Sequence, residues 1–467
     1  MSTRISILSL FLYLLLIPKV HAEISIDQAK LERDSLNTLV DLIKMDTSQP
    51  AGNEYLAVNY LAKRLANEGI AYKIFESIPG RANLVARVKG NGSKKPLLLL
   101  AHTDVVTVER ENWTFDPFMG EVKNGKIFGR GASDDKSVVA TNFEILLALK
   151  RNKTALDRDV IFLAVADEEG GGGLGITFMI ENHLKEIDAE FAINEGGQGL
   201  IDATSNQYTG FIVGTAEKTP RRALLTVKGR AGHGSVPTTD NVIVILSQAI
   251  SNLYTSPLPV RLNETTRTFF TRIATISPPN EKKIIKEILN GDPSMKSQLA
   301  LQKLNPSYYS FIRTSVVPTI INSGYQRNVI PSEAEATLDI RALPGEDPEY
   351  LFERLANIID DDRVKITPMK VTRPAHDPSP LNTALFSAFE TVLSNEHPNA
   401  VVLPYMSTGA TDSAQLRAVG IPSYGFGPGM VSGENNGIHG NDEFLRIEPF
   451  YEYTRLMWLI VTSVAAS

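Results

Sequence analysis

The chain has 467 residues, a formal net charge of -6 and no cysteine. The absence of cysteine excludes disulfides, thiolate nucleophiles and thiolate-bound metals, so any metal site must use His, Asp and Glu. No basic block indicates a nucleic-acid partner. The length favours two domains over one.

Residues 1–22 have the pattern of a secretory signal peptide. Arg4 precedes an apolar run at 5–17, and the small residue Ala22 marks the expected cleavage point. We therefore expect a secreted or periplasmic protein that keeps no stable membrane anchor after cleavage. An uncleaved anchor is the alternative interpretation.

The chain then alternates amphipathic helices with continuous apolar segments. This alternation is typical of an α/β fold with a mainly parallel sheet and helices on both faces. A terminal helix at 450–466 contains Glu452 and Arg455, so we expect it to pack against the protein rather than cross a bilayer. The other expected helices are 27–45, 54–68, 137–151 and 174–186, and the expected strands are 83–90, 96–104, 159–169, 190–197 and 421–429.

Metal-type side chains follow several of these strands. In open α/β sheets, ligands bind beyond the carboxyl ends of the strands. One such acid is more often a solvated cap than a ligand, but several carboxylates at one edge would repel one another without a cation. Imidazole and carboxylate donors suit two zinc ions or similar divalent metals. The candidates are His102, Asp104, Asp134, Asp135, Glu168, Glu169, Glu195 and His439.

Asp104 has a separate expected role. It lies two residues after His102 on an extended segment, so both side chains point to the same side. Its carboxylate is expected to accept the second N–H of the imidazole and fix the tautomer.

At these residues the sequence resembles a known family, the co-catalytic zinc exopeptidases and deacylases. The family includes aminoacylase, glutamate carboxypeptidase, succinyl-diaminopimelate desuccinylase and carboxypeptidase S. The branch of carboxypeptidase S and the N-acyl-amino-acid hydrolases is the most similar. The matching stretches are "LLLAHTDVV", "WTFDPFMGEVKNGKIFGRGASDDK", "AVADEEGGGG", "INEGG", "VKGRAGHGSVP", "RNVIPSEAEATLDIRALP", "STGATDS" and "GIHGNDEFL".

The resemblance implies two metal ions, zinc first and cobalt or manganese as alternatives. It also implies a cis peptide between the two aspartates of "SDDK". The implied roles are Asp134 as the ligand that bridges both ions, His102 and Glu195 at one ion, Glu169 and His439 at the other, Glu168 as general base and acid, and Asp104 as the support of His102.

Residues 219–373 change pattern and predict an inserted α+β domain of ferredoxin-like type, with an antiparallel sheet and helices on one face. The resemblance implies a lid and dimerisation domain, so the catalytic domain would comprise 23–218 and 374–467. Residues 280–312 are expected to form a helical excursion in the lid. The other expected elements are strands at 221–232, 337–343 and 364–371 and helices at 239–254 and 348–359.

Further candidates for substrate contact come from the resemblance. It implies that His233 reaches the active site of a neighbouring subunit and stabilises the oxyanion. Asn328 and Arg341 match positions that grip substrate, and Gly409 and Thr411 match positions beside the substrate backbone. Arginine suits a carboxylate because its fork bonds both oxygens, although a salt bridge on the strand surface explains Arg341 equally well. His183, His376 and His397 are assigned no role: the first lies on a helix and the others beside prolines in polar loops.

The expected reaction is hydrolysis of an amide next to a C-terminal amino acid. Two divalent ions would bind a water between them and lower its pKa, and Glu168 would take its proton. The protein would then be a carboxypeptidase or dipeptidase whose substrates are small peptides. The alternative is an aminoacylase-like deacylase, whose substrates would be N-acyl amino acids. A binding protein that lost catalysis would lack a ligand or the base, whereas here the set is complete. A homodimer through the lid is also expected.

Overall fold

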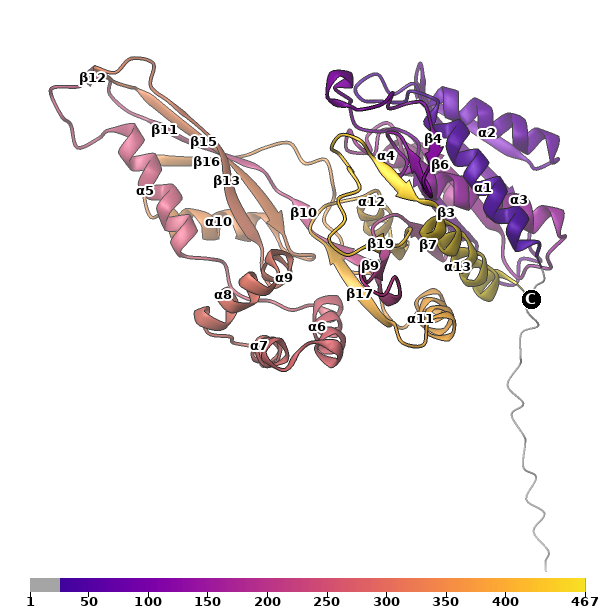
Figure 1. Cartoon of the computed structure of the whole chain (residues 1–467). Helices are drawn as coiled ribbons and strands as arrows, with labels where there is room; N and C mark the ends of the chain where they lie inside the picture. The colour runs from indigo at the N-terminus through magenta and orange to yellow at the C-terminus, as the bar shows by residue number, and fades with distance from the viewer. Residues whose placement is uncertain (1–25, 467) are drawn as a thin grey trace, which may run out of the picture.

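The computed structural model describes residues 26–466, and the predicted signal peptide at 1–22 lies outside them. Two β-sheets organise the described chain. In Figure 1 the larger sheet and its helices lie to the right, and the second sheet extends to the left. Within residues 26–466, no helix combines the length and apolar character needed to cross a membrane.

The larger sheet has ten strands and is mixed. Its strand β3 (Leu97–His102) is fully buried and lies parallel to β6 (Val160–Val165) on one side and β7 (Phe191–Asn194) on the other. Beyond β6, the strands β2 (Arg81–Val88) and β1 (Tyr72–Ile78) run antiparallel to their neighbours. The remaining strands are β8 (Gln198–Ile201), β9 (Tyr208–Glu217), β17 (Val401–Ser407), β18 (Ser423–Gly425) and β19 (Met430–Val431).

Alternate side chains of β3 enter two different cores, as the period of two in a strand requires. Leu97 and Leu99 belong to the core covered by the larger helix group, whereas Leu98 and Leu100 belong to the core on the opposite face. The predicted α/β class with helices on both faces is therefore confirmed. The larger group contains α1 (Gln28–Ile43), α2 (Tyr55–Asn67), α3 (Lys136–Arg151), α11 (Ala384–Glu396) and α13 (Ile447–Ala465), and the smaller group contains α4 (Ile176–Ile187) and α12 (Ser413–Ala418).

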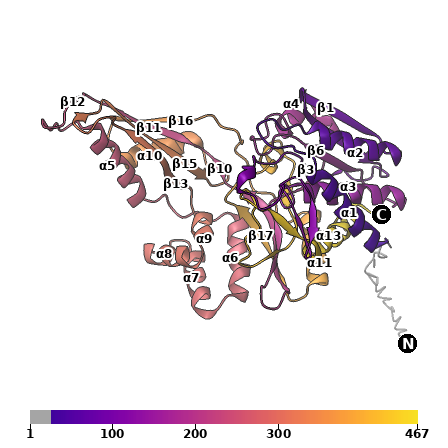
Figure 2. The ribbon, with the colours of Figure 1, turned by 45° about the horizontal axis from the view of Figure 1, so that its top comes forward.

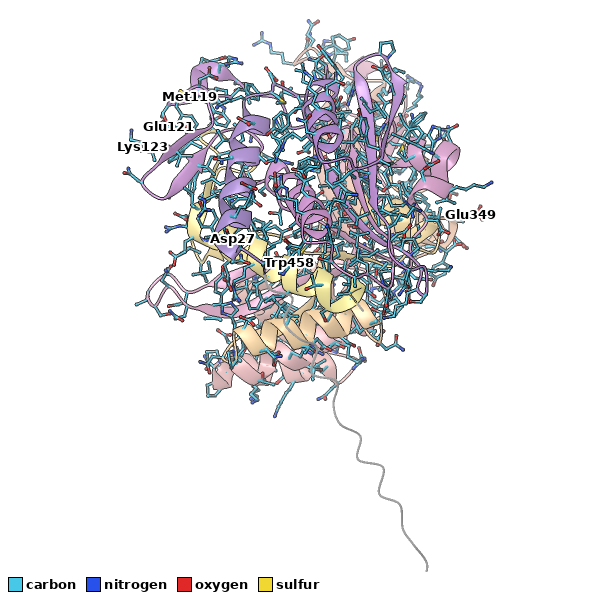
Figure 3. All side chains as sticks on the ribbon, turned by 90° about the vertical axis from the view of Figure 1, so that its right-hand side faces the viewer. Asp27, Met119, Glu121, Lys123, Glu349 and Trp458 are labelled. Carbon is cyan, nitrogen blue, oxygen red and sulfur yellow. The ribbon has the colours of Figure 1, made fainter. Side chains whose placement is uncertain are left out.

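The terminal helix α13 packs against the larger core, as predicted. Met457 and Trp458 are buried in it, and Figure 3 shows Trp458 on this helix. The two charged residues that interrupt its apolar run pair with each other, Arg455 donating to Glu452 over 2.7 Å.

A small sheet ties together two loops that matter for the site. It consists of β4 (Glu121–Lys123), β5 (Lys126–Phe128) and β20 (Phe444–Arg446), all antiparallel, next to a 3-10 turn at Arg110–Asn112. Glu121 and Lys123 lie on its outer edge in Figure 3. Because β5 precedes the Asp134 loop and β20 follows the His439 loop, the pairing of β5 with β20 brings these two loops together.

The second sheet is antiparallel and carries helices on one face, as predicted. Helices α5 and α10 pack with the sheet residues in one apolar core. At its far end, two short strands form a separate pair that Figures 1 and 2 show distant from the larger sheet. The elements are β10 (Thr219–Pro220), β11 (Ala223–Lys228), β13 (Ser315–Ser323), β15 (Glu333–Ala342), β16 (Val364–Pro368), α5 (Val242–Thr255), α10 (Pro348–Ile359), β12 (Gly232–His233) and β14 (Val329–Ile330). The domain boundaries at 219 and 373 stay a prediction.

The predicted helical excursion consists of short helices that brace the larger sheet. Ile285 and Phe311 share an apolar core with Leu403 and Met406 of β17. The excursion is therefore not confined to the lid sheet. Residues 280–312 form α7 (Pro279–Leu289), α8 (Met295–Leu304) and α9 (Pro306–Phe311). Helix α6 (Glu264–Ile276) precedes them and packs in the same core.

Candidate active site

His102 ends the buried strand β3 and points at two carboxylates. Its Nε2 lies 3.1 Å from Asp134 Oδ1 and 3.7 Å from Glu195 Oε1. Glu195 directly follows β7, the parallel neighbour of β3. One ligand atom from each of these three residues lies within 4.8 Å of the others, as a metal ion requires. The strand ends thus converge as the sequence predicted.

Asp134 and His439 form a second group with Glu169. His439 Nε2 lies 3.1 Å from Asp134 Oδ2 and 3.0 Å from Glu169 Oε1, and these three residues also meet the distance condition for a metal. The two carboxylate oxygens of Asp134 therefore face different imidazoles. Hydrogen bonds to Asp134 and Glu169 raise the pKa of His439 to about 10. The peptide bond between Asp134 and Asp135 is cis, as the family resemblance implied.

Asp104 is fully buried and supports more than the imidazole. His102 Nδ1 lies 3.0 Å from the Asp104 carbonyl oxygen and 3.5 Å from its Oδ1, so the carbonyl is the closer partner. The Asp104 carboxylate also accepts the backbone N–H groups of Glu168 and Glu169, each over 3.1 Å. Gln49 Nε2 donates to it over 2.8 Å. One side chain therefore fixes the turn that presents both glutamates.

Glu443 fixes the loop that contains Asp134 by accepting its backbone N–H groups, a role that the sequence analysis did not identify. Its fully buried carboxylate accepts the backbone N–H groups of Gly131, Ser133 and Asp134 over 3.0, 2.8 and 3.1 Å. Arg130 Nη1 donates to it over 2.7 Å. The residue lies inside the matching stretch "GIHGNDEFL", which was the available signal.

Glu168 is buried beside Arg373, which the sequence analysis also missed. Arg373 Nη2 donates to the Glu168 carbonyl oxygen over 3.0 Å and to the Glu168 carboxylate. Its Nη1 donates to Asp412 over 2.7 Å and to Gln415 over 3.1 Å. Burial opposes the charge of Arg373, but Asp412 and Glu168 outweigh burial and raise its pKa. The guanidinium therefore joins Glu168 to the start of α12.

The carboxylates of the site are crowded, and this crowding tests whether cations fit there. Burial raises the pKa of Glu195 well above its usual range, and the charges of Asp134 and Glu168 raise it further. Burial also raises the pKa of Glu168. Asp134 differs from these two glutamates, because bonds to His102 and His439 outweigh burial and lower its pKa. Divalent ions would relieve this repulsion, and the His and carboxylate donors match what zinc accepts.

The structure does not bring the predicted substrate-binding residues of the lid to the two groups of metal-type residues. His233 and Asn328 meet at the far tip, where Gly234 N–H donates to the Asn328 carbonyl oxygen over 2.8 Å. Arg341 lies on β15 and donates to both carboxylate oxygens of Asp339, over 2.9 and 3.2 Å. This is the strand-surface salt bridge that was the alternative interpretation.

The loop after β17 shows two different environments. Gly409 is exposed, and its N–H donates to Ser407 Oγ over 3.1 Å. Thr411 is buried and turned inward, where its hydroxyl donates to Glu217 over 2.9 Å. Among the described residues, neither Gly409 nor Thr411 makes a hydrogen bond to the metal-type side chains.

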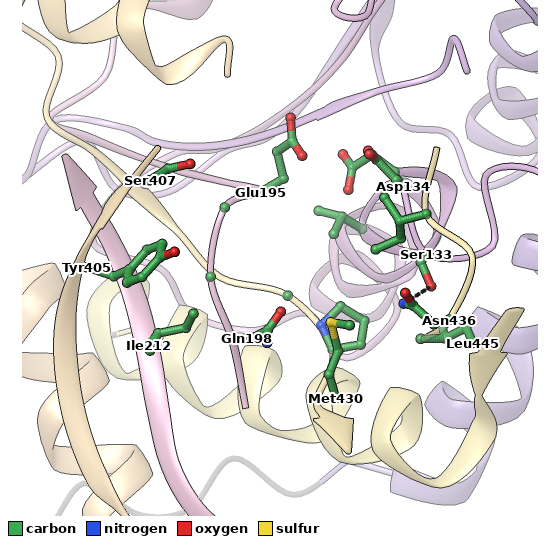
Figure 4. Close-up of a pocket in the computed structure, with 17 residues that line it drawn as sticks. Ser133, Asp134, Glu195, Gln198, Ile212, Tyr405, Ser407, Met430, Asn436 and Leu445 are labelled. Carbon is green, nitrogen blue, oxygen red and sulfur yellow. Dashed lines mark hydrogen bonds between the residues drawn. The ribbon is translucent and has the colours of Figure 1, made fainter. Parts of the chain in front are cut away.

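A cavity of about 290 Å³ opens beside Asp134 and Glu195. Figure 4 shows the two carboxylates side by side at its edge. The walls are mostly apolar, and none of the residues that line the cavity is Lys or Arg. The labelled wall residues include Ile212, Tyr405, Met430 and Leu445, and the polar side chains are Ser133, Gln198, Ser407 and Asn436.

The three histidines without an assigned role lie outside both groups of metal-type residues. His183 stacks on Phe75 with ring centroids 4.1 Å apart. His397 Nε2 lies 2.6 Å from Glu452 Oε1. His376 lies in a loop, as expected, but its side chain is buried, with Nε2 3.9 Å from Glu217 Oε1.

Known proteins of similar sequence include several amidohydrolases. The chain is 30% identical over 377 residues to a probable carboxypeptidase S-like protein of Dictyostelium discoideum, covering 79% of this chain and 72% of that protein. It is 28% identical over 383 residues to a human N-fatty-acyl-amino acid synthase/hydrolase, and the match covers 79% of this chain and 74% of that protein. It is 27% identical over 426 residues to mouse aminoacylase-1, and the match covers 89% of this chain and 93% of that protein.

Solved structures share the fold. A family M20 metallo-carboxypeptidase from Sulfolobus solfataricus has a TM-score of 0.67 at 20% identity, covering 92% of this chain and 99% of that one. A dinuclear metal binding peptidase from Bacillus subtilis has a TM-score of 0.60 at 16% identity, and the match covers 93% of this chain and 99% of that one. The model of peptidase family M20/M25/M40 matches residues 98–463. This chain therefore belongs to peptidase family M20/M25/M40, a family of metal-dependent peptidases and amidohydrolases.

Proposed function

We propose that the protein hydrolyses the amide bond next to a C-terminal amino acid, as a carboxypeptidase or dipeptidase, with two divalent ions. The observation that carries the proposal is that two three-residue groups of metal-type donors share Asp134. His102 and Glu195 would hold one ion, and Glu169 and His439 the other. Bound there, the ions would supply Lewis acidity and a lowered pKa for a water.

Glu168 is the proposed general base and acid. It follows β6 at the same sheet edge as the two groups of donors and lies in one of the combinations that meet the metal-distance condition, with His102 and Glu169. Its buried carboxylate has a raised pKa, which suits a group that must take a proton and return it. In the proposed reaction Glu168 takes a proton from the attacking water and delivers it to the leaving nitrogen.

The lid would complete the site through a homodimer. Strand β13 is an edge of the second sheet, and its Val317, Ile320 and Ile321 are between 50% and 59% exposed. Such an apolar edge is a template for pairing with a second copy. We propose that the dimer carries His233 and Asn328 at the lid tip to the partner's site, where His233 stabilises the oxyanion.

Deacylation of N-acyl amino acids is the second candidate. The cavity beside Asp134 and Glu195 is lined mainly by apolar residues and has no cationic wall, so it suits an apolar side chain or an acyl group. Relatives with acylase names point the same way. The two activities cleave the same kind of bond, so the proposed metal ligands and Glu168 serve both.

Zinc is the proposed working metal, and export is the proposed fate of the chain. Zinc suits imidazole and carboxylate donors in a site without thiolate, although cobalt and manganese accept the same set. The signal pattern at 1–22 supports secretion or export to a periplasm. Sequencing the N-terminus of the exported protein is expected to place cleavage after Ala22, and retention of Met1 would contradict it.

A panel of substrates assayed with defined metals tests the proposal. Metal-free protein would be loaded with zinc, cobalt or manganese and offered dipeptides, longer peptides and N-acyl amino acids. We expect chelation to abolish hydrolysis and zinc to restore it, with peptides cleaved faster than N-acyl amino acids. Faster cleavage of N-acyl amino acids would favour the deacylase. Undiminished activity after complete metal removal would contradict the proposed centre.

A further inference from the structure

A second cavity lies between the lid helices and the helical excursion, and it shares no lining residue with the candidate active site. Its volume is about 390 Å³, within the range of small-molecule sites. Its walls come from the ends of α5 and α10, from α8 and α9, and from the start of β13. Leu258, Leu299 and Leu355 are among the apolar residues that line it, and polar side chains form the rest of the wall.

Arg313 is the one charged residue that lines this cavity. The residue is 97% buried, with a relative exposure of 3%, and within residues 26–466 it forms no salt bridge. Its Nη2 donates to the neutral Gln298 side chain. Its guanidinium carbon lies 4.3 Å from the centre of the Tyr309 ring. Its Nε has no hydrogen-bond partner among the described residues. A buried cation without an anion is costly, so this arrangement calls for one.

The neighbouring polar groups are also arranged as donors. The buried Lys218 amino group donates to Ser310 Oγ over 2.9 Å and to Ser315 Oγ over 3.3 Å. Because both hydroxyl oxygens accept from Lys218, their own O–H groups remain free to donate. Glu346, which accepts the hydroxyl of Thr314, lies 3.6 Å from Arg261 and makes no ion pair with Arg313.

We propose that this cavity binds an amphipathic carboxylate, with the carboxylate at Arg313 and an apolar chain along the leucine-rich wall. The apolar part of the wall favours a ligand with an apolar chain, and the donors around Arg313 favour an anionic group. A free fatty acid and an N-acyl amino acid both have this chemistry. The site is distinct from the proposed centre of hydrolysis and does not depend on that function.

Calorimetric titration of the metal-loaded, full mature chain with decanoate and with decanamide tests the proposal. We expect one decanoate per chain and weaker binding of decanamide. Arg313→Met removes the charge at similar length, so decanoate should bind about ten- to a hundredfold more weakly while decanamide is unchanged. Equal affinity for decanoate and decanamide, or unchanged decanoate binding in Arg313→Met, would overturn the site.

Two further arms keep the outcome decisive. Leu299, which is 44% exposed on α8, can be changed to Trp to narrow the cavity if Arg313→Met does not fold. Decanoate binding that survives Leu299→Trp would overturn the proposal, as would a wild type that binds no decanoate. Titration of Glu168→Gln and of Glu168→Gln with Arg313→Met separates the two sources, because only the binding lost with Arg313 belongs to this cavity. If that part is tighter for N-decanoylglycine than for decanoate, the cavity is assigned to acylated amino acids, and if it is weaker, to free acids.

Discussion

Replacing Arg373 by Met is expected to disable catalysis without removing a metal ligand. The guanidinium holds the Glu168 carboxylate and carbonyl and, at its other nitrogen, Asp412. All three side chains are buried, with exposures of 6%, 8% and 1%. Removing one partner of a buried ion pair costs about 3–5 kcal/mol of stability. General acid–base catalysis contributes about 10²–10⁴-fold, so misplacing Glu168 should lower kcat about a hundredfold.

The assay must separate positioning from stability. Steady-state kinetics with metal content and urea unfolding would be measured for Arg373→Met, Arg373→Lys and a matched control, Arg417→Met. Arg417 is equally buried, 3.5 Å from Glu217, and does not touch Glu168. We expect a similar stability loss in both Met variants, but a fall in kcat at unchanged KM only at position 373, with partial rescue by Lys. A folded Arg373→Met variant with wild-type kcat, or with only KM raised, would refute the reasoning.

Four other predictions concern single residues. Glu168→Gln should keep both metals and lose about 10²–10⁴-fold in kcat, and a near-wild-type rate would remove Glu168 as the base. His102→Ala and Asp134→Ala should each lower the bound metal measured by elemental analysis, and full stoichiometry in both would refute the ligand set. Because Arg341 pairs with Asp339 away from both metal-type groups, Arg341→Ala should change cleavage of substrates with a free carboxylate and of their amides equally, as should Asp339→Asn; a loss about tenfold larger for the carboxylates would show that Arg341 binds them. Burial lowers the pKa of Lys218 to about 7 from an ordinary 10.5. Between these values the unfolded chain binds a proton that the folded chain lacks, so stability should rise with pH by up to about 1.4 kcal/mol per unit. Urea unfolding from pH 7 to 10 should show this slope in the wild type and lose it in Lys218→Met; the same slope in both would exclude Lys218 as its source.

The buried strands could be read from the sequence because their apolar runs are uninterrupted. Two strands that were not predicted each contain a proline: β17 has Pro404 and β13 has Pro318. Proline lacks an N–H, so its presence argues against a central strand. Both strands have a single partner, β9 and β15 respectively, and β13 has an irregular register beside its proline. A proline inside an apolar run is therefore compatible with an edge strand, as β13 and β17 show.

The metal-type residues at the strand ends could likewise be predicted, because parallel strands deliver their carboxyl ends to one edge. His439 was a candidate from the sequence, but its pairing with Glu169 at one ion came from the family resemblance, since it lies on an irregular loop with a left-handed backbone. Arg373 and Glu443 could not be found in this way. Arg373 reaches Glu168 across 205 positions of sequence, and Glu443 reaches Asp134 across 309, so no local pattern records either contact.

The two buried acids that bond backbone N–H groups explain how the site is held together. Asp104 fixes the turn of Glu168 and Glu169, and Glu443 fixes the loop of Asp134. Bonds to His102, Gln49 and the Glu168 N–H outweigh burial and lower the pKa of Asp104. Burial outweighs the Arg130 charge and the accepted N–H groups at Glu443 and raises its pKa. The proposed metal donors thus sit on segments anchored by groups that are not themselves donors. Such anchoring places the donor carboxylates close together before any ion binds, and the resulting repulsion is what gives divalent cations their affinity for this edge of the sheet.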